Sequence, residues 1–241
     1  MALESSDDRV ALISGASRGI GLAITNTLYN AGWKIVANSR NLLELKKAHE
    51  YKDFNRIHFV AGDCSVQATA VTMVADALRL YGNVDLLVLN AGYGFFGGIE
   101  SGSDQEIQEI VQSNVLGTIR LIRAVTPYMK ARNSGDIVII SSNAGLRGGR
   151  NEAVYAATKH AQLGLAGSLD RELREFGIRV SCILPGNVDT SFGQSYSVAQ
   201  RQRSERPLEP EDVARSLVFI VSQPKSMRIT QVILLPMSQG S

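Results

Sequence analysis

The chain has 241 residues, of which 44% are hydrophobic and 20% are charged, the balance of a soluble globular protein. With 25 basic and 23 acidic residues the net charge is +2, which gives no reason to expect nucleic acid or an anionic membrane as a partner. The polar start MALESSDDRV lacks the basic and apolar regions of a signal peptide, and no apolar run reaches the ~18 residues of a membrane span. The cysteines Cys64 and Cys182 are too few for a disulfide scaffold or a zinc site. We therefore expect no metal, two packed thiols and a cytoplasmic protein.

Short apolar runs rich in β-branched residues alternate with longer helix-like segments. The predicted strands are 9–14, 34–38, 56–61, 84–90, 136–141, 178–184 and 229–235. The predicted helices lie near 19–31, 41–50, 66–81, 104–131, 153–176 and 210–222. Continuous apolar strands that alternate with helices indicate a parallel sheet covered on both faces, and right-handed crossovers make it doubly wound. We predict one α/β domain over residues 1–241 with about seven strands.

Two helix starts and one long loop are visible in the local sequence. Ser103 and Glu106 have the spacing of a capping box, and Pro210 followed by two acids suits a first helical turn. Residues 186–208 are polar and carry Phe192, and a stretch of that length outside regular structure is often a lid or a substrate loop. A plain surface loop is the alternative interpretation of this segment.

The segment SGASRGIG, residues 14–21, follows the first predicted strand and opens the first predicted helix. Glycines remove side chains where a ligand must approach the backbone, and a helix start offers N–H groups and a positive dipole end to phosphate. The spacing is Gly-x-x-x-Gly-x-Gly, and a short glycine loop also occurs as an ordinary turn. The residues expected to contact the phosphates of a dinucleotide are Gly15, Ser17, Arg18, Gly19, Ile20 and Gly21.

The second predicted strand runs into Ser39 and Arg40, where a dinucleotide site usually has an acid for the ribose hydroxyls. Without that acid, the guanidinium groups of Arg18 and Arg40 suit a 2′-phosphate, which favours NADP(H) over NAD(H). The alternative for either arginine is a solvated surface charge. Further candidates for cofactor binding follow the third and fourth strands: Asp63, for the adenine amino group, Cys64, Asn90, Ala91 and Gly92.

The stretch YAATK puts Tyr155 and Lys159 one helical turn apart on one face. A nearby ammonium lowers the pKa of a phenol, and such a phenol can exchange a proton with a carbonyl or alcohol oxygen. The pattern alone more often means a packed ring and a surface charge. However, Ser141 and Ser142 end the fifth strand, which puts a hydroxyl near a substrate oxygen beside Tyr155. Asn114 is unfavourable inside a long predicted helix, where it has a local task or points to solvent.

Taken together, these motifs resemble the short-chain dehydrogenase/reductase family over nearly the whole chain. The motifs are SGASRGIG, NAG at 90–92, Asn114 in QSNVLGT, SS at 141–142, YAATK at 155–159 and PGNVDT at 185–190. The resemblance implies a Rossmann fold and a homo-oligomer, either a tetramer or a dimer. In such an oligomer the helices at 104–131 and 153–176 pair between subunits.

The same resemblance implies roles for the four candidate catalytic residues. Tyr155 would be the acid/base, Lys159 would lower its pKa and bind the nicotinamide ribose, and Ser142 would position the substrate oxygen. Asn114 would hold a helix distortion and a water of the proton relay. The resemblance also assigns nicotinamide contacts to Pro185, Gly186, Val188 and Thr190.

The function expected from these residues is an NADPH-dependent carbonyl reductase, reversible as an alcohol dehydrogenase, that acts on a small carbonyl or hydroxy substrate. A non-catalytic NADP(H)-sensing regulatory protein on the same fold is the alternative, and the complete catalytic set argues against it. Candidate pocket residues are Tyr93, Phe95, Leu146, Arg147, Phe192 and Tyr196. Arg147 or Arg150 is a candidate for a substrate carboxylate or phosphate, and Arg201, Arg203 and Arg206 for an acyl-carrier-protein surface, against the default of solvated charges.

Overall fold

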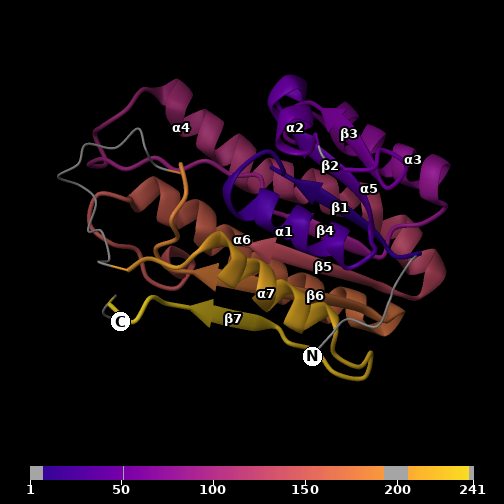
Figure 1. The fold of residues 1–241 in the computed structure, drawn as a ribbon. Helices are drawn as coiled ribbons and strands as arrows, with labels where there is room; N and C mark the ends of the chain where they lie inside the picture. The colour runs from indigo at the N-terminus through magenta and orange to yellow at the C-terminus, as the bar shows by residue number, and fades with distance from the viewer. Residues whose placement is uncertain (1–7, 51, 193–205, 239–241) are drawn as a thin grey trace.

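The computed structural model describes residues 8–50, 52–192 and 206–238. Seven parallel strands form one sheet in the order β3-β2-β1-β4-β5-β6-β7 (Figure 1). The strands are β1 (Val10–Ser14), β2 (Lys34–Ser39), β3 (Ile57–Ala61), β4 (Leu86–Leu89), β5 (Gly135–Ile140), β6 (Ile178–Pro185) and β7 (Gln231–Leu234). The strand order reverses between β1 and β4, and α/β sheets of this kind bind ligands at the carboxyl ends of the strands at that point.

Helices cover both faces of the sheet, as predicted. The helices are α1 (Gly19–Asn30), α2 (Leu42–Ala48), α3 (Gln67–Tyr81), α4 (Asp104–Val111), α5 (Gly117–Arg132), α6 (Ala153–Leu173) and α7 (Pro210–Val221). The buried side chains of α1, α2 and α7 pack in one cluster, and those of α3, α5 and α6 pack in another on the opposite face. Within the described ranges, no helix is both long enough and apolar enough to cross a membrane.

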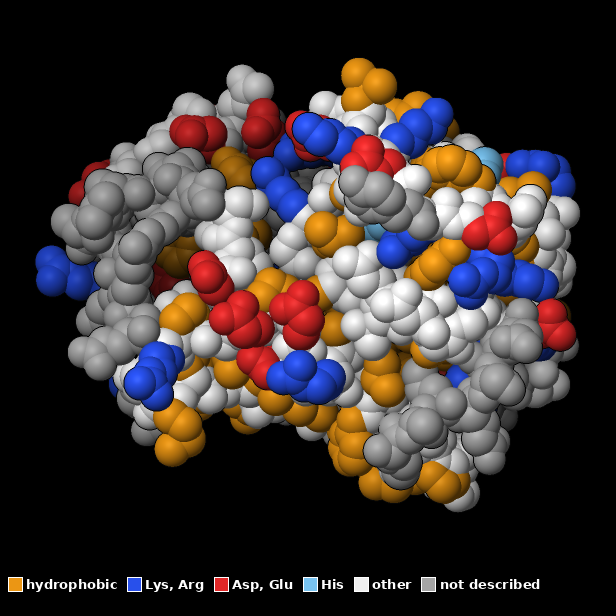
Figure 2. Space-filling model, in the orientation of Figure 1, with side chains coloured by type: hydrophobic (Ala, Val, Ile, Leu, Met, Phe, Trp, Pro, Cys, Tyr) orange, Lys and Arg blue, Asp and Glu red, His pale blue; other side chains and the backbone are white. Residues whose placement is uncertain are grey.

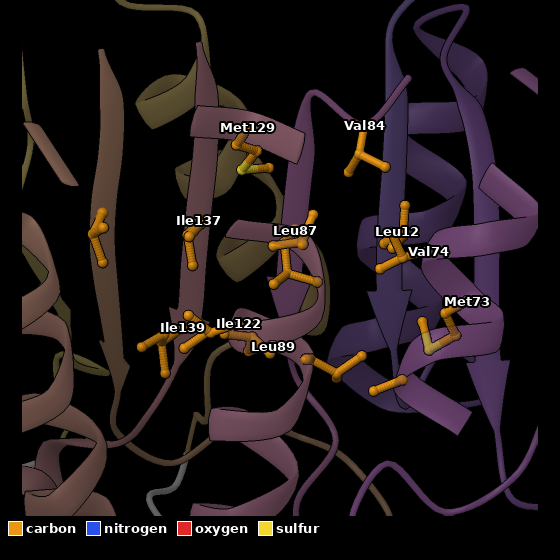
Figure 3. Packing of buried hydrophobic residues seen from close by; sticks show 14 of the residues in the cluster. Leu12, Met73, Val74, Val84, Leu87, Leu89, Ile122, Met129, Ile137 and Ile139 are labelled. Carbon is orange, nitrogen blue, oxygen red and sulfur yellow. The ribbon is translucent and has the colours of Figure 1, made fainter. Parts of the chain in front are cut away.

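The strands are apolar throughout because both of their faces are buried. On β1, Leu12 packs into the cluster with α3 and α5, and the next residue, Ile13, packs into the cluster with α1 and α7. Figure 3 shows the first cluster, in which Leu12, Leu87 and Ile137 lie on neighbouring strands. A fully buried side chain of this size contributes about 1.5–3 kcal/mol, so the two clusters hold the sheet rigid beneath its carboxyl edge.

The helix predicted at 104–131 is helical throughout but has a change of pitch that apolar periodicity did not predict. It is two helices, α4 and α5, joined by the π-helical turn Gln112–Leu116. The backbone N–H of Gly117 bonds to the carbonyl of Gln112, five residues earlier. Asn114 sits in the middle of this turn and is fully buried, so of the two alternatives it has the local task rather than the solvent-facing position.

The predicted helix starts are confirmed. Ser103 Oγ accepts from the Glu106 N–H at 3.3 Å, and Glu106 Oε2 accepts from the Ser103 N–H at 2.8 Å. Pro210 is the first residue of α7, after the N-cap Glu209. Of the long loop, residues 186–192 and 206–208 are described and are joined by a bridge between Val188 and Leu208. The remainder of the expected lid, with Tyr196, Arg201 and Arg203, lies outside the described residues.

Candidate active site

The glycine loop between β1 and α1 has no room for a side chain at Gly15 or Gly21. Gly15 and Gly19 have φ of +68° and +52°, and a Cβ on Gly21 would lie 2.1 Å from the Gly15 carbonyl oxygen. Asn90 Nδ2 donates to that carbonyl at 3.0 Å and ties the loop to the end of β4. The first turn of α1, residues 19–22, is fully described and holds no acid and no side-chain cap. The loop therefore presents backbone N–H groups and a positive dipole end to an anion.

The two arginines predicted to bind a 2′-phosphate are both exposed at this edge of the sheet. Arg18 is the N-cap of α1, and Arg40 follows the last residue of β2. Arg40 is close enough to Tyr93 to act on its pKa, which burial raises and the Arg40 charge lowers. Figure 2 shows basic side chains over the part of the molecule that carries α2. Planar guanidinium groups at this position suit a phosphate that approaches from solvent.

Asp63 and Cys64 follow β3, and the side chain of each is hydrogen-bonded to another part of the protein. Asp63 Oδ1 accepts from the Ser65 N–H at 2.7 Å. The Cys64 thiol is buried and donates to Asn38 Oδ1 at 3.0 Å, and burial raises its pKa to about 12. The thiol therefore joins the ends of β2 and β3, and the backbone of Cys64 is the part of this residue left for a ligand.

Asn114 connects the π turn to the chain just past β4. Its Oδ1 accepts from the Tyr93 N–H at 2.9 Å, and its Nδ2 donates to the Tyr93 carbonyl at 2.9 Å and to Thr158 Oγ1 at 3.0 Å. The helix distortion implied for Asn114 is therefore present. Its own carbonyl accepts from Thr118 Oγ1 at 2.8 Å and from Gln162 Nε2 at 2.8 Å.

Tyr155, Lys159 and Ser142 come together at the carboxyl end of β5. Tyr155 and Lys159 are both buried in the first turns of α6, and the Lys159 ammonium lies 5.7 Å from the centre of the Tyr155 ring. Ser142 caps the short turn Asn143–Gly145 through the Ala144 N–H at 3.2 Å, and its hydroxyl is close enough to Tyr155 to act on the pKa of the phenol. Ser141 instead donates to the Lys159 carbonyl at 3.2 Å. Of the two serines, Ser142 is the one whose hydroxyl meets the phenol.

The pKa of Tyr155 differs from the sequence-based expectation. Burial raises it to about 12, against a hydrogen bond with Ser142 that acts in the lowering direction, and the Glu152 charge raises it further. Burial also lowers the pKa of Lys159 to about 8. Desolvation of the ring therefore sets the direction of the net pKa shift in this structure, opposite to the net lowering expected from the sequence.

Aromatic side chains surround the Tyr155 ring. The ring centre of Phe96 lies 5.2 Å away and that of Phe192 lies 6.0 Å away. Tyr93 and Phe95, both predicted pocket residues, pack in the same small cluster as Tyr155. The other described pocket candidates, Leu146, Arg147 and Arg150, are exposed, and Arg206 is exposed beside the undescribed segment. The groups next to the phenol are therefore mainly apolar.

The segment after β6 returns to the glycine loop. Pro185 ends the strand, and the Gly186 N–H donates to the Leu234 carbonyl at 2.7 Å. A Cβ on Gly19 would lie 3.1 Å from Thr190 Cγ2, so Thr190 is next to the start of α1. This arrangement places two predicted cofactor segments, from opposite halves of the chain, against each other at the strand ends.

Sequence reasoning missed Phe96, Thr158 and Gln162. Thr158 Oγ1 donates to the Tyr155 carbonyl at 2.7 Å, and Gln162 contacts the Lys159 ammonium at 3.0 Å. The available signal for Gln162 was its spacing, because a polar residue three positions after Lys159 lies on the same helix face. No comparable sequence signal distinguishes Phe96 from an ordinary packed ring.

The parallel sheet, the glycine loop and the buried Tyr, Lys, Ser and Asn side chains define a dinucleotide-dependent oxidoreductase fold. The sequence matches the family described as short chain dehydrogenase over residues 9–201. The chain belongs to this family.

Individual relatives agree with this assignment over nearly the full chain. A protein of Staphylococcus aureus described as an uncharacterized oxidoreductase is 28% identical over 229 residues, which are 95% of this chain and 97% of that one. An alcohol dehydrogenase from the archaeon Thermococcus sibiricus, complexed with 5-hydroxy-NADP, superposes with a TM-score of 0.87 at 28% identity, covering 97% of this chain and 98% of that one. The closed form of a serine dehydrogenase complexed with NADP+ gives 0.88 at 27% identity, covering 96% of each chain.

Proposed function

We propose that this protein is an NADPH-dependent carbonyl reductase that oxidises the corresponding alcohol in the reverse direction. The observation that carries the proposal is the buried Tyr155 phenol, which lies next to the Ser142 hydroxyl and the Lys159 ammonium at the strand ends that also hold the glycine loop. A proton donor held beside a hydroxyl that can bind the same oxygen is what reduction of a carbonyl requires.

The choice of NADP(H) is supported by the residues at the adenosine end of the site. The glycine loop would hold the pyrophosphate, and Arg18 and Arg40 would hold the 2′-phosphate. Lys159 would bind the nicotinamide ribose, and Thr190 would approach the carboxamide. The two solved neighbours named above are complexes with NADP+ or a derivative, which also favours this cofactor.

The chain's own residues account for the proton side of the reaction. When bound, the nicotinamide supplies the hydride that reaches the carbonyl carbon. Tyr155 Oη donates its proton to the carbonyl oxygen, and Ser142 Oγ hydrogen-bonds to that oxygen and orients it. Because the pKa of Tyr155 is raised to about 12, the phenol is protonated at neutral pH. This protonation state favours the reductive direction.

The substrate that fits these surroundings is a small carbonyl compound with an apolar or aromatic group next to the carbonyl. Phe96 and Phe192 flank the Tyr155 ring, and rings at such distances favour offset or edge contacts with apolar groups. We propose that these rings hold the substrate's apolar part while Tyr155 and Ser142 hold its oxygen.

We further propose that the protein is a homodimer or tetramer in the cytoplasm. An apolar groove of about 460 Å³ between the α4 end and α6 supports pairing with a second subunit; it is lined by Ile99, Val111, Val115, Ala153, Val154, Ala157, Thr158 and Ala161. The two cysteines are free and buried, which suits a reducing compartment.

Fluorescence titration of the purified protein with NADPH and with NADH, followed by turnover of ketones, β-keto esters and quinones, tests the proposal. Tighter binding of NADPH and turnover of a carbonyl are the expected results. Tight NADPH binding without turnover across the panel contradicts the reductase and favours the alternative, a cofactor-sensing protein.

A further inference from the structure

The Lys159 ammonium is held by neutral oxygen atoms. Its Nζ donates to Gln162 Oε1 at 3.0 Å and to the Ile140 carbonyl at 3.2 Å. The side chain is 5% exposed, so these oxygens take the place of water around the charge. An ammonium has three N–H donors, and these two bonds leave one for the side of Tyr155 and a bound ligand.

Gln162 joins this ammonium to the π turn. Its Nε2 donates to the Asn114 carbonyl at 2.8 Å and to Thr118 Oγ1 at 3.2 Å, while its Oε1 accepts from Lys159. Gln162 is 1% exposed, and each half of its amide has a partner. A buried amide satisfied at both ends fixes the position of what it binds, because every rotation breaks a hydrogen bond in a buried site.

The uncharged amide of Gln162 matters for the charge of Lys159 as well as for its position. A carboxylate in its place would pair with the ammonium and cancel the positive charge that reaches the Tyr155 phenol. An apolar side chain would leave a buried charge without one of its acceptors. The amide holds the ammonium without cancelling its charge.

We propose that Gln162 is a positioning residue of the active site, which ties the Lys159 ammonium to the π turn and keeps its charge available to Tyr155. The inference rests on the proposed function, because it deepens the roles assigned there to Lys159 and Tyr155. It also gives the π turn a purpose, since Gln162 bonds to Asn114 within that turn and to Thr118, the second residue of α5.

Two substitutions separate charge from position, and a third serves as the control. Gln162→Glu keeps the size and the acceptor but adds a negative charge, and Gln162→Met keeps the length but removes every hydrogen bond. Thr126→Val removes a half-buried hydrogen bond at 2.7 Å to the Ile122 carbonyl, within α5 and away from Lys159. The titratable groups that face Lys159 are Tyr155 on α6 and the Cys182 thiol on β6, and Glu152 acts on Tyr155.

The kinetic experiment measures kcat and KM against pH in both reaction directions with NADP(H). For Gln162→Glu we expect the rising limb of alcohol oxidation to move to higher pH by about one unit, because the phenolate loses a stabilising charge. For Gln162→Met we expect kcat to fall about 10-fold with little change in the KM of the carbonyl substrate. Thr126→Val should match the wild type in both respects. Profiles of both Gln162 variants that superimpose on the wild type would overturn the inference.

A second readout needs neither cofactor nor substrate. NMR titration of the Lys159 ammonium in protein labelled with carbon-13 lysine gives the pH midpoint of its ionisation, which we expect near 8 in the wild type and about one unit or more higher in Gln162→Glu. An unchanged midpoint overturns the positioning role even if the protein turns over no carbonyl. Absence of turnover in the wild type counts against the proposed function alone.

Discussion

Tyr155 shows how strongly a single residue's chemistry depends on its surroundings. Its partner Lys159 was identifiable from the spacing in YAATK, and so was Ser142 from its position at a strand end. The direction of the pKa shift of Tyr155 could not be predicted from the sequence. Desolvation depends on how completely Phe96, Phe192 and the end of β5 enclose the ring. A sequence motif identifies the residues that take part in proton transfer but does not predict how deeply they are buried.

The raised pKa of Tyr155 predicts different pH dependences for the two reaction directions. Reduction needs the phenol, which is protonated at all pH values well below about 12, so kcat/KM for the carbonyl should be nearly level from pH 6 to pH 7, below the pKa of Lys159 at about 8. Oxidation needs the phenolate, so kcat/KM for the alcohol should rise with pH across this range. Steady-state rates in both directions over a pH series measure this. A plateau of alcohol oxidation below pH 7 would show that Tyr155 ionises far more easily than we expect.

Arg40 carries the prediction on cofactor choice. Arg40→Asp removes a charge-assisted hydrogen bond to the 2′-phosphate and adds repulsion, so we expect NADPH binding to weaken by about 10- to 100-fold. NADH has no such phosphate, and its affinity should stay within about 3-fold. Lys47→Asp, an exposed charge reversal in α2, is the matched control. Equal losses for both cofactors would refute the role of Arg40 in binding the 2′-phosphate.

Among the elements, the seven strands and most helix limits followed from apolar runs and capping residues. The π turn could not be predicted from these patterns, because its cause is a tertiary contact. Asn114 forms hydrogen bonds with the backbone of Tyr93, more than 20 residues away in sequence. An unfavourable Asn inside a predicted helix signals a local task without naming the partner. The same limit explains why Gln162, on a correctly predicted helix, was missed.

Asn114→Ala tests what the π turn contributes to stability. The substitution leaves the Tyr93 N–H and carbonyl without their partner, and each unsatisfied buried group costs about 1–3 kcal/mol. We expect the free energy of unfolding in urea to fall by about 3 kcal/mol and turnover to fall with it, because Tyr93 borders the site. Gln105→Ala, which removes an exposed hydrogen bond to Glu109 on α4, should change stability by less than about 0.5 kcal/mol. An Asn114→Ala protein as stable as this control would contradict the assignment.

For the whole molecule, the doubly wound sheet brings segments from both halves of the chain to one edge. The glycine loop, the end of β4 and Thr190 meet there, and α6 adds Tyr155 beside Ser142. This convergence was predictable from the rule that parallel strands present their carboxyl ends at one edge. The aromatic surroundings of Tyr155 were only partly predictable, since Phe96 and Phe192 reach it from loops.

We predict that the apolar groove beside α6 is the contact between subunits. Val111 is 43% exposed in that groove, and Val111→Glu would bury a charge in a subunit contact. We expect light scattering after gel filtration to give a mass at least twofold lower than that of the wild type. Val71→Glu, at an exposed site on α3, should leave the mass unchanged. A Val111→Glu protein with the wild-type mass would exclude this groove as the contact.

Proton donation by Tyr155 is the central step of the proposed NADPH-dependent reduction. Comparison of Tyr155→Phe with the wild type, for both carbonyl turnover and NADPH affinity, tests that claim. The substitution removes one oxygen atom from a buried ring, and we expect kcat for reduction to fall by about 10²–10⁴-fold while NADPH affinity changes by less than about 3-fold. Turnover at the wild-type rate by Tyr155→Phe would contradict the claim.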